Sequence, residues 1–391
     1  MNKHIILYFF VIIIIVLDVF VFYKVQKDKT EDIAHSSQII PLQNSINTNV
    51  NAISEDDSIS KIPLQQKVGQ MLIVGFHDTS VSTTSIIIKT INDLNLGGLI
   101  LFDHNIENPT QLKKLIYNIK QFTNSHLFIS VDLEGGEINR LKSKNGFMDF
   151  PSAQSLGTIG DLAEIQNDGI NIGTELSNYG FNMNFAPVVD ININPSNPII
   201  GKLGRSFSSD PQQVITEAKT FIDGLHSKNI ISVIKHFPGH GSSVSDSHLG
   251  FVDITKTYQQ KELLPFQKLE NDTDAIMVAH VTNKNIDPNY PASLSPLFIQ
   301  NILRNQLSYN GVIISDDMEM GVISKNYTLE KAIILAINSG NDILIFSNNN
   351  DQMPYKVNKI ILDAINNGEI SIDTINIAYK RIQKLKTNYN L

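Results

Sequence analysis

From residue 62 onward the chain alternates short apolar runs with longer segments in which apolar residues recur at helical spacing. The short runs show little polar alternation, which is typical of strands buried on both faces of a sheet. The predicted strands cover residues 71–76, 99–102, 127–132, 182–187, 231–236, 275–280, 312–316 and 343–346. The predicted helices cover residues 110–122, 162–179, 211–226, 296–307, 329–338, 355–367 and 373–387.

This repeated strand–helix order predicts a parallel sheet, because parallel strands need a crossover connection that is usually a helix. Eight such units predict an α/β fold of the (β/α)8 TIM-barrel type, formed as one domain by residues 61–391. An open, doubly wound sheet is the alternative. Its nucleotide-binding form is disfavoured, since no glycine-rich phosphate loop follows the first predicted strand.

The N-terminal segment has a different pattern. Residues 5–23 are apolar apart from Asp18, and lysines flank them on both sides. A helix of about 20 such residues spans the hydrocarbon core of a membrane. Residues 1–27 are predicted to be an uncleaved transmembrane anchor rather than a signal segment, because no small-residue cleavage site follows the apolar run. Residues 28–60, rich in Ser, Asn, Asp and Gln, are predicted to be a flexible linker.

An N-terminal anchor before one large domain predicts a single-pass protein of the cell membrane whose domain lies outside the cytoplasm. A secreted protein is the alternative, and the lysines on both flanks do not decide the orientation. The net charge of −8 disfavours a nucleic-acid partner. The absence of cysteine excludes disulfides, thiolate metal sites and a lipid-modified cysteine.

Polar side chains stand where several predicted strands end. They are Asp132, Lys235, His236, His280 and Asp316. In a barrel, catalytic groups come from the C-terminal ends of several different strands. The sequence therefore predicts one active site at this rim.

The densest group of such residues lies in residues 235–248, which hold three histidines, a lysine and an aspartate. Asp246 and His248 are two positions apart, so in an extended segment they lie on one side. A carboxylate beside a histidine orients the ring and favours its charged form, as a general acid/base requires. Gly239 and Gly241 are interpreted as making this loop mobile.

A metal site in the same stretch is a competing interpretation, with His236, His240, Asp246 and His248 as ligands. It is disfavoured because all four ligands would come from one glycine-containing loop with no supporting helix. Neither a metal nor another cofactor is expected.

Carboxylates also mark the ends of two other predicted strands. Asp316 is interpreted as a nucleophile, general base or metal ligand, and Asp317 as a helix N-cap. Asp132 precedes a glycine pair that lets the backbone turn, and it could accept hydrogen bonds from sugar hydroxyls, with Arg140 as a fixed donor. An ion pair that stabilises the loop is the alternative for this second segment.

Four motifs occur together in a fixed order. They are Val-Asp-Leu-Glu-Gly-Gly at 131–136 with Arg140, Gly-Arg-Ser-Phe at 204–207, Lys-His-Phe-Pro-Gly-His-Gly at 235–241 with Asp-Ser-His at 246–248, and Ser-Asp-Asp-Met at 315–318. Together they resemble the β-N-acetylhexosaminidase branch of glycoside hydrolase family 3. Leu133 departs from the resemblance, because many members of that family have glutamine there.

The resemblance implies a retaining β-N-acetylglucosaminidase on a (β/α)8 barrel. Such an enzyme removes terminal, non-reducing, β-linked N-acetylglucosamine, here from peptidoglycan-derived muropeptides, through a covalent glycosyl-enzyme intermediate. By position, Asp316 resembles the nucleophile and His248 the acid/base, with Asp246 as its partner. The residues that resemble sugar-binding residues are Asp132, Arg140, Arg205, Lys235 and His236.

Two other functions remain as alternatives on the same fold. A histidine acid/base, uncharged when deprotonated, could admit phosphate and make the enzyme a β-N-acetylglucosaminide phosphorylase. A non-catalytic muropeptide-binding protein of the envelope is the second alternative, and the intact Asp316, Asp246 and His248 count against it.

Overall fold

The computed structural model describes residues 57–391, apart from 125, 247–249, 251 and 348–349. The predicted anchor, residues 1–27, and most of the predicted linker lie outside the described residues. At the end of the predicted linker, Asp57–Ser60 form a short helix, α2. No helix within the described ranges is long and apolar enough to cross a membrane.

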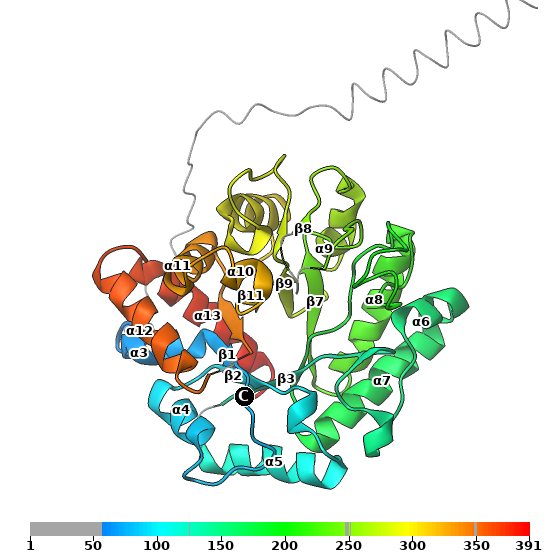
Figure 1. Ribbon diagram of the computed structural model, residues 1–391. Coiled ribbons are helices and arrows are strands. Elements are labelled where there is room, and N and C mark those ends of the chain that lie inside the picture. The colour runs from blue at the N-terminus through cyan, green and yellow to red at the C-terminus, as the bar shows by residue number, and fades with distance from the viewer. Residues whose placement is uncertain (1–56, 125, 247–249, 251, 348–349) are drawn as a thin grey trace, which may run out of the picture. The chain divides into compact units, whose positions relative to one another are not determined.

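Eight parallel strands close into a barrel within the described part of the chain (Figure 1). They are β1 (Leu72–Val74), β2 (Gly98–Ile100), β3 (Phe128–Val131), β6 (Met183–Asn184), β7 (Ile231–Phe237), β9 (Ala275–Val278), β11 (Val312–Asp317) and β12 (Ile343–Phe346). Their order around the barrel follows the chain, and β12 pairs with β1 to close it. The predicted strands and the barrel are confirmed, and closure excludes the open sheet.

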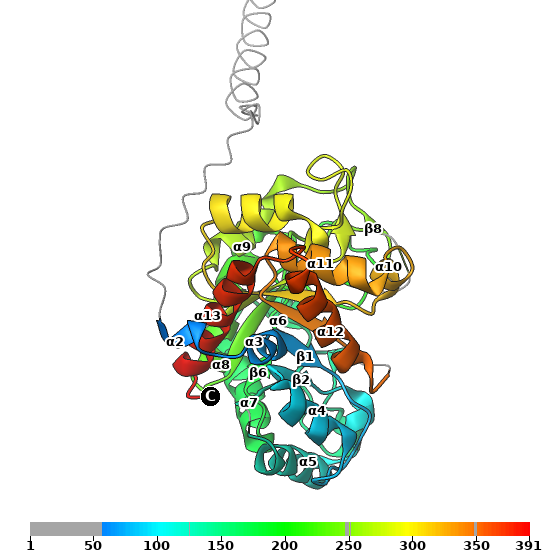
Figure 2. The same ribbon diagram turned by 90° about the vertical axis from the view of Figure 1, so that its left-hand side faces the viewer.

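Helices surround the barrel. The longer ones are α3 (Leu64–Gln70), α4 (Ile86–Leu94), α5 (Pro109–Phe122), α7 (Leu162–Tyr179), α8 (Pro211–His226), α11 (Leu329–Ser339), α12 (Met353–Asn366), α13 (Ile372–Asn388) and the π-helix η5 (Leu297–Gln306). Helix α3 packs against α12 and α13, so the two ends of the described domain lie side by side (Figure 2). All the predicted helices are present, whereas α3 and α4 were not predicted.

Shorter elements complete the loops at the rim and between the helices. They are β4 (Leu133–Gly135), β5 (Ile138–Asn139), α6 (Ala153–Ile159), β8 (Val252–Asp253), α9 (Leu264–Lys268), β10 (Val281–Thr282), α10 (Gly321–Ser324) and the single turns η1 (Asp103–Asn105), η2 (Ser143–Asn145), η3 (Gln260–Leu263) and η4 (Ala292–Leu294). Strands β4 and β5 form an antiparallel hairpin directly after β3, and this hairpin reaches the active-site rim.

Side-chain caps explain why several helices begin where the sequence indicates. Asn108 accepts a hydrogen bond from the first turn of α5, Asp161 does so for α7, and Asp210 for α8. Such caps satisfy backbone N–H groups that have no partner inside the helix. Pro109 and Pro211 occupy the first helical positions, where a missing N–H has no cost.

A buried ion network fixes the amino-terminal end of β12. Asp342 is 1% exposed, and its Oδ2 atom accepts hydrogen bonds from Arg304 Nη2 at 2.6 Å and from the Ile313 amide at 2.8 Å. Its Oδ1 atom accepts from Arg381 Nη1 at 3.1 Å. One carboxylate therefore links η5, β11 and α13 beneath the barrel.

The Asp342→Ala substitution should lower the free energy of unfolding by about 3–5 kcal/mol, because it leaves the buried Arg304 without its partner. Urea denaturation of both proteins measures this difference. The matched control is Asp363→Ala, which breaks a solvent-exposed pair with Lys359 and should cost about 1 kcal/mol or less. Equal losses in the two variants would contradict the role assigned to Asp342.

Candidate active site

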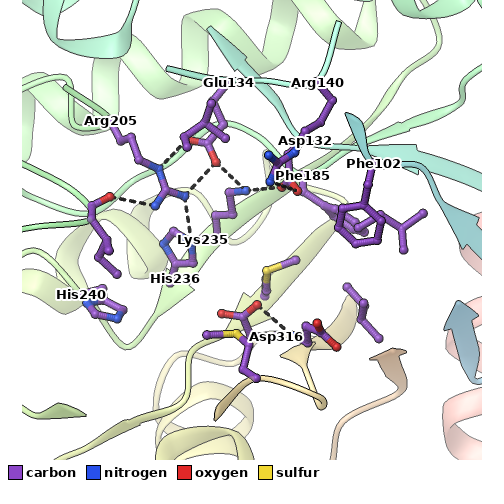
Figure 3. Close-up of a pocket in the computed structure, with 17 residues that line it drawn as sticks. Phe102, Asp132, Glu134, Arg140, Phe185, Arg205, Lys235, His236, His240 and Asp316 are labelled. Carbon is purple, nitrogen blue, oxygen red and sulfur yellow. Dashed lines mark hydrogen bonds and ion pairs between the residues drawn. The ribbon is translucent and has the colours of Figure 1, made fainter. Parts of the chain in front are cut away.

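A pocket of about 220 Å³ opens at the carboxyl ends of the barrel strands (Figure 3). Six of the predicted site residues line it: Asp132, Arg140, Arg205, Lys235, His236 and Asp316. Asp246 is half-buried and is not among the lining residues. His248 lies outside the described residues, so its role as acid/base stays a prediction.

A bulge at the end of β7 brings two consecutive residues into the pocket. Ile234 is in register with Ile276, but Phe237 is in register with Val278, so β7 has one extra residue between them. A bulge of this kind re-aims side chains that would otherwise alternate between faces. Both Lys235 and His236 consequently line the pocket. In a regular strand only one of two consecutive side chains would face the pocket.

Strand β11 ends in the same way. Ile314 is in register with Ile343 and Asp317 with Ile345, so β11 has one more residue than β12 between these two pairs. Asp316 and Asp317 both line the pocket as a result.

Glu134 is a site residue that the sequence analysis missed. It lies two positions after Asp132, and both carboxylates line the pocket while Leu133 between them is fully buried. The side chain of Asn184, on β6, bonds the N–H and the C=O of Leu133 at 3.0 and 2.9 Å, which fixes the strand. The alternation of strand side chains could have pointed to Glu134.

Glu134 lies at the centre of a network of charges. Its two oxygens accept hydrogen bonds from Arg205 Nε at 2.7 Å and Arg205 Nη2 at 2.8 Å, in a bidentate pair. Lys235 Nζ lies 2.7 Å from Glu134 Oε1 and 2.7 Å from Asp132 Oδ1. The two cations are thus held by two carboxylates, and all four side chains face the pocket (Figure 3).

The network stabilises the charges of two buried side chains, Glu134 and Arg205. Burial alone would raise the pKa of Glu134, but the charges of Arg205 and Lys235 and their hydrogen bonds outweigh it and hold the pKa well below its usual range. Burial would likewise lower the pKa of Arg205, and the carboxylate of Glu134 raises it above its ordinary value instead. Both groups therefore remain ionised across the physiological pH range.

Hydrogen bonds define the tautomer of His236. Its Nε2 atom lies 3.2 Å from Arg205 Nη2, and because a guanidinium can only donate, Nε2 accepts. Its Nδ1 atom lies 2.7 Å from Oδ2 of the buried Asp190 and donates to that carboxylate. Asp190 is thus a positioning residue for His236, although its loop gave no sign of this in the sequence.

The segment after β7 is firmly packed up to Ser243. Asp190 Oδ1 accepts from the His240 amide at 2.7 Å, and Asn197 Nδ2 donates to the His240 carbonyl at 2.7 Å. A Cβ atom on Gly241 would lie 1.8 Å from the carbonyl oxygen of Ile191, so this glycine permits a close approach of two backbones. Close packing therefore accounts for Gly241, and the predicted mobility of the loop stays a prediction.

His240 was unassigned by sequence and lies in the pocket lining, 1% exposed. Burial lowers its pKa to about 4, which keeps the ring neutral at neutral pH. Its Nδ1 atom lies 2.8 Å from Ser243 Oγ, and this contact joins two residues of the same loop.

Arg140 extends the network toward the opening of the pocket. Its Nη2 atom lies 3.7 Å from Asp132 Oδ2, and its Nη1 atom lies 3.5 Å from Asp103 Oδ1. Its Nε atom is buried and has no hydrogen-bond partner among the described residues. The side chain of Arg140 lines the pocket and is 28% exposed, and its role in sugar binding stays a prediction.

The end of β11 is held by its neighbours. Asp316 Oδ1 accepts from the Asp317 amide at 2.8 Å, and the Asp317 carbonyl accepts from Nε2 of the buried His280 at 2.9 Å. The Asp317 carboxylate accepts from the amides of Glu319 and Ser347, both at 3.0 Å. It therefore caps a turn and joins β11 to β12, whereas the predicted helix N-cap role was wrong.

The donor set does not form a metal cage within the described ranges, where no three His, Asp or Glu side chains are arranged to hold an ion. His236 and His240 direct their Nδ1 atoms at Asp190 and Ser243. The alternative metal site would also need His248, which lies outside the described residues.

Chemically, the pocket suits a ligand that is rich in hydroxyl groups. Carboxylates, ammonium and guanidinium groups bond to hydroxyls with defined direction, and the barrel rim is the usual place for catalysis in this fold. Asp316 lies across the pocket from this charged wall (Figure 3). The fold and the site together define the class of barrel enzymes that act on carbohydrates.

Comparisons with known proteins give the family. The sequence pattern of the glycosyl hydrolase family 3 N-terminal domain matches residues 63–385. A β-hexosaminidase from Tolumonas auensis is 38% identical over 269 residues, which are 65% of this chain and 76% of the relative. The chain therefore belongs to family 3 of the glycoside hydrolases.

Solved structures agree with this assignment. A family 3 β-N-acetylglucosaminidase from Paenibacillus sp. FPU-7 superposes with a TM-score of 0.79 at 34% identity over 84% of this chain, and the match spans 63% of that protein's length. A β-N-acetylhexosaminidase from Beutenbergia cavernae gives a TM-score of 0.74 at 25% identity, over 83% of this chain and 99% of that one.

The Glu134→Gln substitution should destabilise the protein by roughly 2–5 kcal/mol, because it leaves two buried cations facing one remaining carboxylate. The same change should lower kcat/KM, since Lys235 and Arg205 lose the group that holds them in place. Urea denaturation and steady-state kinetics report the two effects. Unchanged stability together with unchanged kcat/KM would contradict the central position assigned to Glu134.

Proposed function

We propose that this protein is a retaining β-N-acetylglucosaminidase that hydrolyses terminal, non-reducing β-linked N-acetylglucosamine. The observation that carries the proposal is the position of the Asp316 carboxylate across the pocket from a wall of hydroxyl-binding charges (Figure 3). The names of the relatives, β-hexosaminidase and β-N-acetylglucosaminidase, support the same activity.

The wall would bind the sugar and set its orientation. Asp132, Lys235 and Arg140 present charged groups toward the pocket, and Asp132 pairs with both cations. Groups fixed in this way need little rearrangement when the substrate binds, which favours the reacting geometry. The anomeric carbon of the sugar would then lie beside Asp316.

The reaction proceeds in two displacements. An Asp316 oxygen attacks the anomeric carbon, the bond to the leaving oxygen breaks, and the acid/base gives its proton to that oxygen. Water then attacks the glycosyl-enzyme ester, the acid/base takes a proton from the water, and Asp316 is released as a carboxylate. Each step conserves charge and returns the enzyme to its starting form.

We assign the acid/base role to His248, with Asp246 as its partner. A histidine is neutral after it has given up its proton, so it does not place a second anion beside Asp316. This removes the like-charge repulsion that two neighbouring carboxylates would have.

The physiological substrate and location follow from the N-terminal pattern. Residues 5–23, apolar apart from Asp18, have the length that spans a membrane, and this supports a tether that places the barrel outside the cytoplasm. Peptidoglycan fragments that carry N-acetylglucosamine are the β-linked substrates that such a location would offer.

The Asp316→Asn variant should hydrolyse an aryl β-N-acetylglucosaminide at least about 1,000-fold more slowly than the unmodified protein, because the amide cannot attack the anomeric carbon. Asp363→Asn, a change at an exposed helix position, serves as the control and should keep the full rate. A comparable rate in Asp316→Asn would contradict the nucleophile assignment.

An aryl β-glucoside should be turned over more slowly than its N-acetylglucosamine counterpart.

Replacement of His248 by alanine should lower the rate of hydrolysis of each substrate in proportion to the general acid assistance that its leaving group requires. An activated nitrophenyl glycoside should lose little in the glycosylation step, whereas a disaccharide should lose about 10²–10⁴-fold. Single-turnover kinetics with both substrates separates the two cases. Equal losses for the two leaving groups would argue against His248 as the acid.

A histidine acid/base would also be compatible with phosphate as the acceptor, which makes a phosphorylase the second candidate. Product analysis in the presence and absence of phosphate distinguishes the two reactions. Free N-acetylglucosamine under both conditions supports hydrolysis, and N-acetylglucosamine 1-phosphate supports phosphorolysis.

A further inference from the structure

Three rings form a stacked row that leads out of the pocket. The ring centroids of Phe102 and His104 lie 5.7 Å apart with their planes inclined by 24°, and those of His104 and His77 lie 5.0 Å apart at 28°. Phe102 lines the pocket, whereas His104 and His77 are exposed. The row therefore starts inside the active site and continues along the rim formed by the loops after β2 and β1.

The row is held rigidly from below. Asn105 is fully buried, and its side chain bonds the Phe102 amide at 2.9 Å, the Phe76 carbonyl at 2.8 Å and the Asp78 carbonyl at 3.1 Å. His104 Nε2 donates to the same Phe76 carbonyl at 2.8 Å, which fixes the plane of its ring. These hydrogen bonds join the loop after β1 to the loop after β2.

The pocket opens toward this row of three rings. Side-chain exposure is 3% at Lys235 and 5% at Glu134, and it rises to 16% at Asp132 and 28% at Arg140. Asp103, which lies between two ring residues in the chain, is 51% exposed and pairs with Arg140. Figure 3 shows Phe102 on the opposite side of the pocket from Arg205 and His240.

The direction in which the pocket opens decides where the rest of a substrate lies when its terminal sugar occupies the pocket. The buried pair of Glu134 and Arg205 closes one end, so the remainder of the substrate has to extend through the open side. Phe102 and the two imidazoles are the flat surfaces on that path. The parts of the ring faces that the neighbouring rings leave uncovered carry partial negative charge, and they can pack against the C–H groups on a face of a pyranose ring.

A second cavity of about 340 Å³ lies at the outer end of the row. His77 lines it together with Asp78 and Asp351, and Ser85 contributes a hydroxyl. Carboxylates and hydroxyls of this kind accept and donate hydrogen bonds to sugar hydroxyls. The row therefore joins two polar cavities, which is the layout of a site for more than one sugar.

We propose that Phe102, His104 and His77 form a binding platform for a saccharide leaving group, with the cavity beyond His77 receiving its next unit. This inference rests on the proposed glycosidase function and defines its leaving-group specificity: a sugar ring bound by stacking is preferred over a small alkyl group.

The test compares kcat/KM for the β-1,4-linked N-acetylglucosamine disaccharide with kcat/KM for methyl β-N-acetylglucosaminide, which lacks the second ring. In His104→Ala the ratio of the two should fall roughly 2- to 10-fold, as expected for the loss of one ring contact. His104→Phe keeps a flat ring and should recover most of the ratio. His126→Ala, at an exposed histidine before β3 at the other end of the barrel, is the matched control and should leave the ratio unchanged.

An unchanged ratio in His104→Ala overturns the platform, and so does a loss shared equally by both substrates. His77→Ala provides a second variant, because His77 does not take part in the Asn105 hydrogen bonds. With a β-1,4-linked N-acetylglucosamine trisaccharide as a third substrate, this variant should also lower kcat/KM relative to the methyl glycoside. If the unmodified protein cleaves neither substrate, the proposed reaction fails, and calorimetric titration decides the platform separately. The disaccharide should then bind more tightly than N-acetylglucosamine, and His104→Ala should remove that difference.

Discussion

The site depends on one interaction, the bidentate pair between Glu134 and Arg205, to which Lys235 adds a second cation. Buried charges are costly unless each is paired and hydrogen-bonded, and here each partner satisfies the others. Lys235 is thereby held against Asp132, and Arg205 against His236. A wall of fixed donors and acceptors results, in which the charged groups hold one another in place.

The barrel supplies this wall from segments that are far apart in the chain. Strand β7 contributes Lys235 and His236 to the wall through a bulge, and the hairpin after β3 contributes Glu134. A second bulge, on β11, places Asp316 across the pocket from the wall. Neighbouring groups that do not line the pocket then hold these side chains, as Asp190 does for His236 and His280 for the end of β11. Interruptions of regular strand pairing thus occur where the chemistry is placed, whereas the lower barrel remains regular.

The strands could be predicted because each is a continuous apolar run, and α7 and α8 because capping residues mark their starts. Helix α4 could not, since its run of three isoleucines favours a strand as much as a helix. The motifs located six lining residues, but the bulges depend on the register with neighbouring strands. The partner of Glu134 is likewise 71 positions away in the sequence, so no local pattern reveals it.

The central claim is that Asp316 forms a covalent bond to the sugar. Mass spectrometry of the protein, quenched during turnover of an activated aryl β-N-acetylglucosaminide and digested, tests it most directly. One added N-acetylglucosaminyl unit is expected on the peptide that contains Asp316, and no such adduct is expected in Asp316→Asn. An adduct on another residue would contradict the account. So would turnover through the substrate's own acetamido group, detected as an oxazoline with no protein adduct.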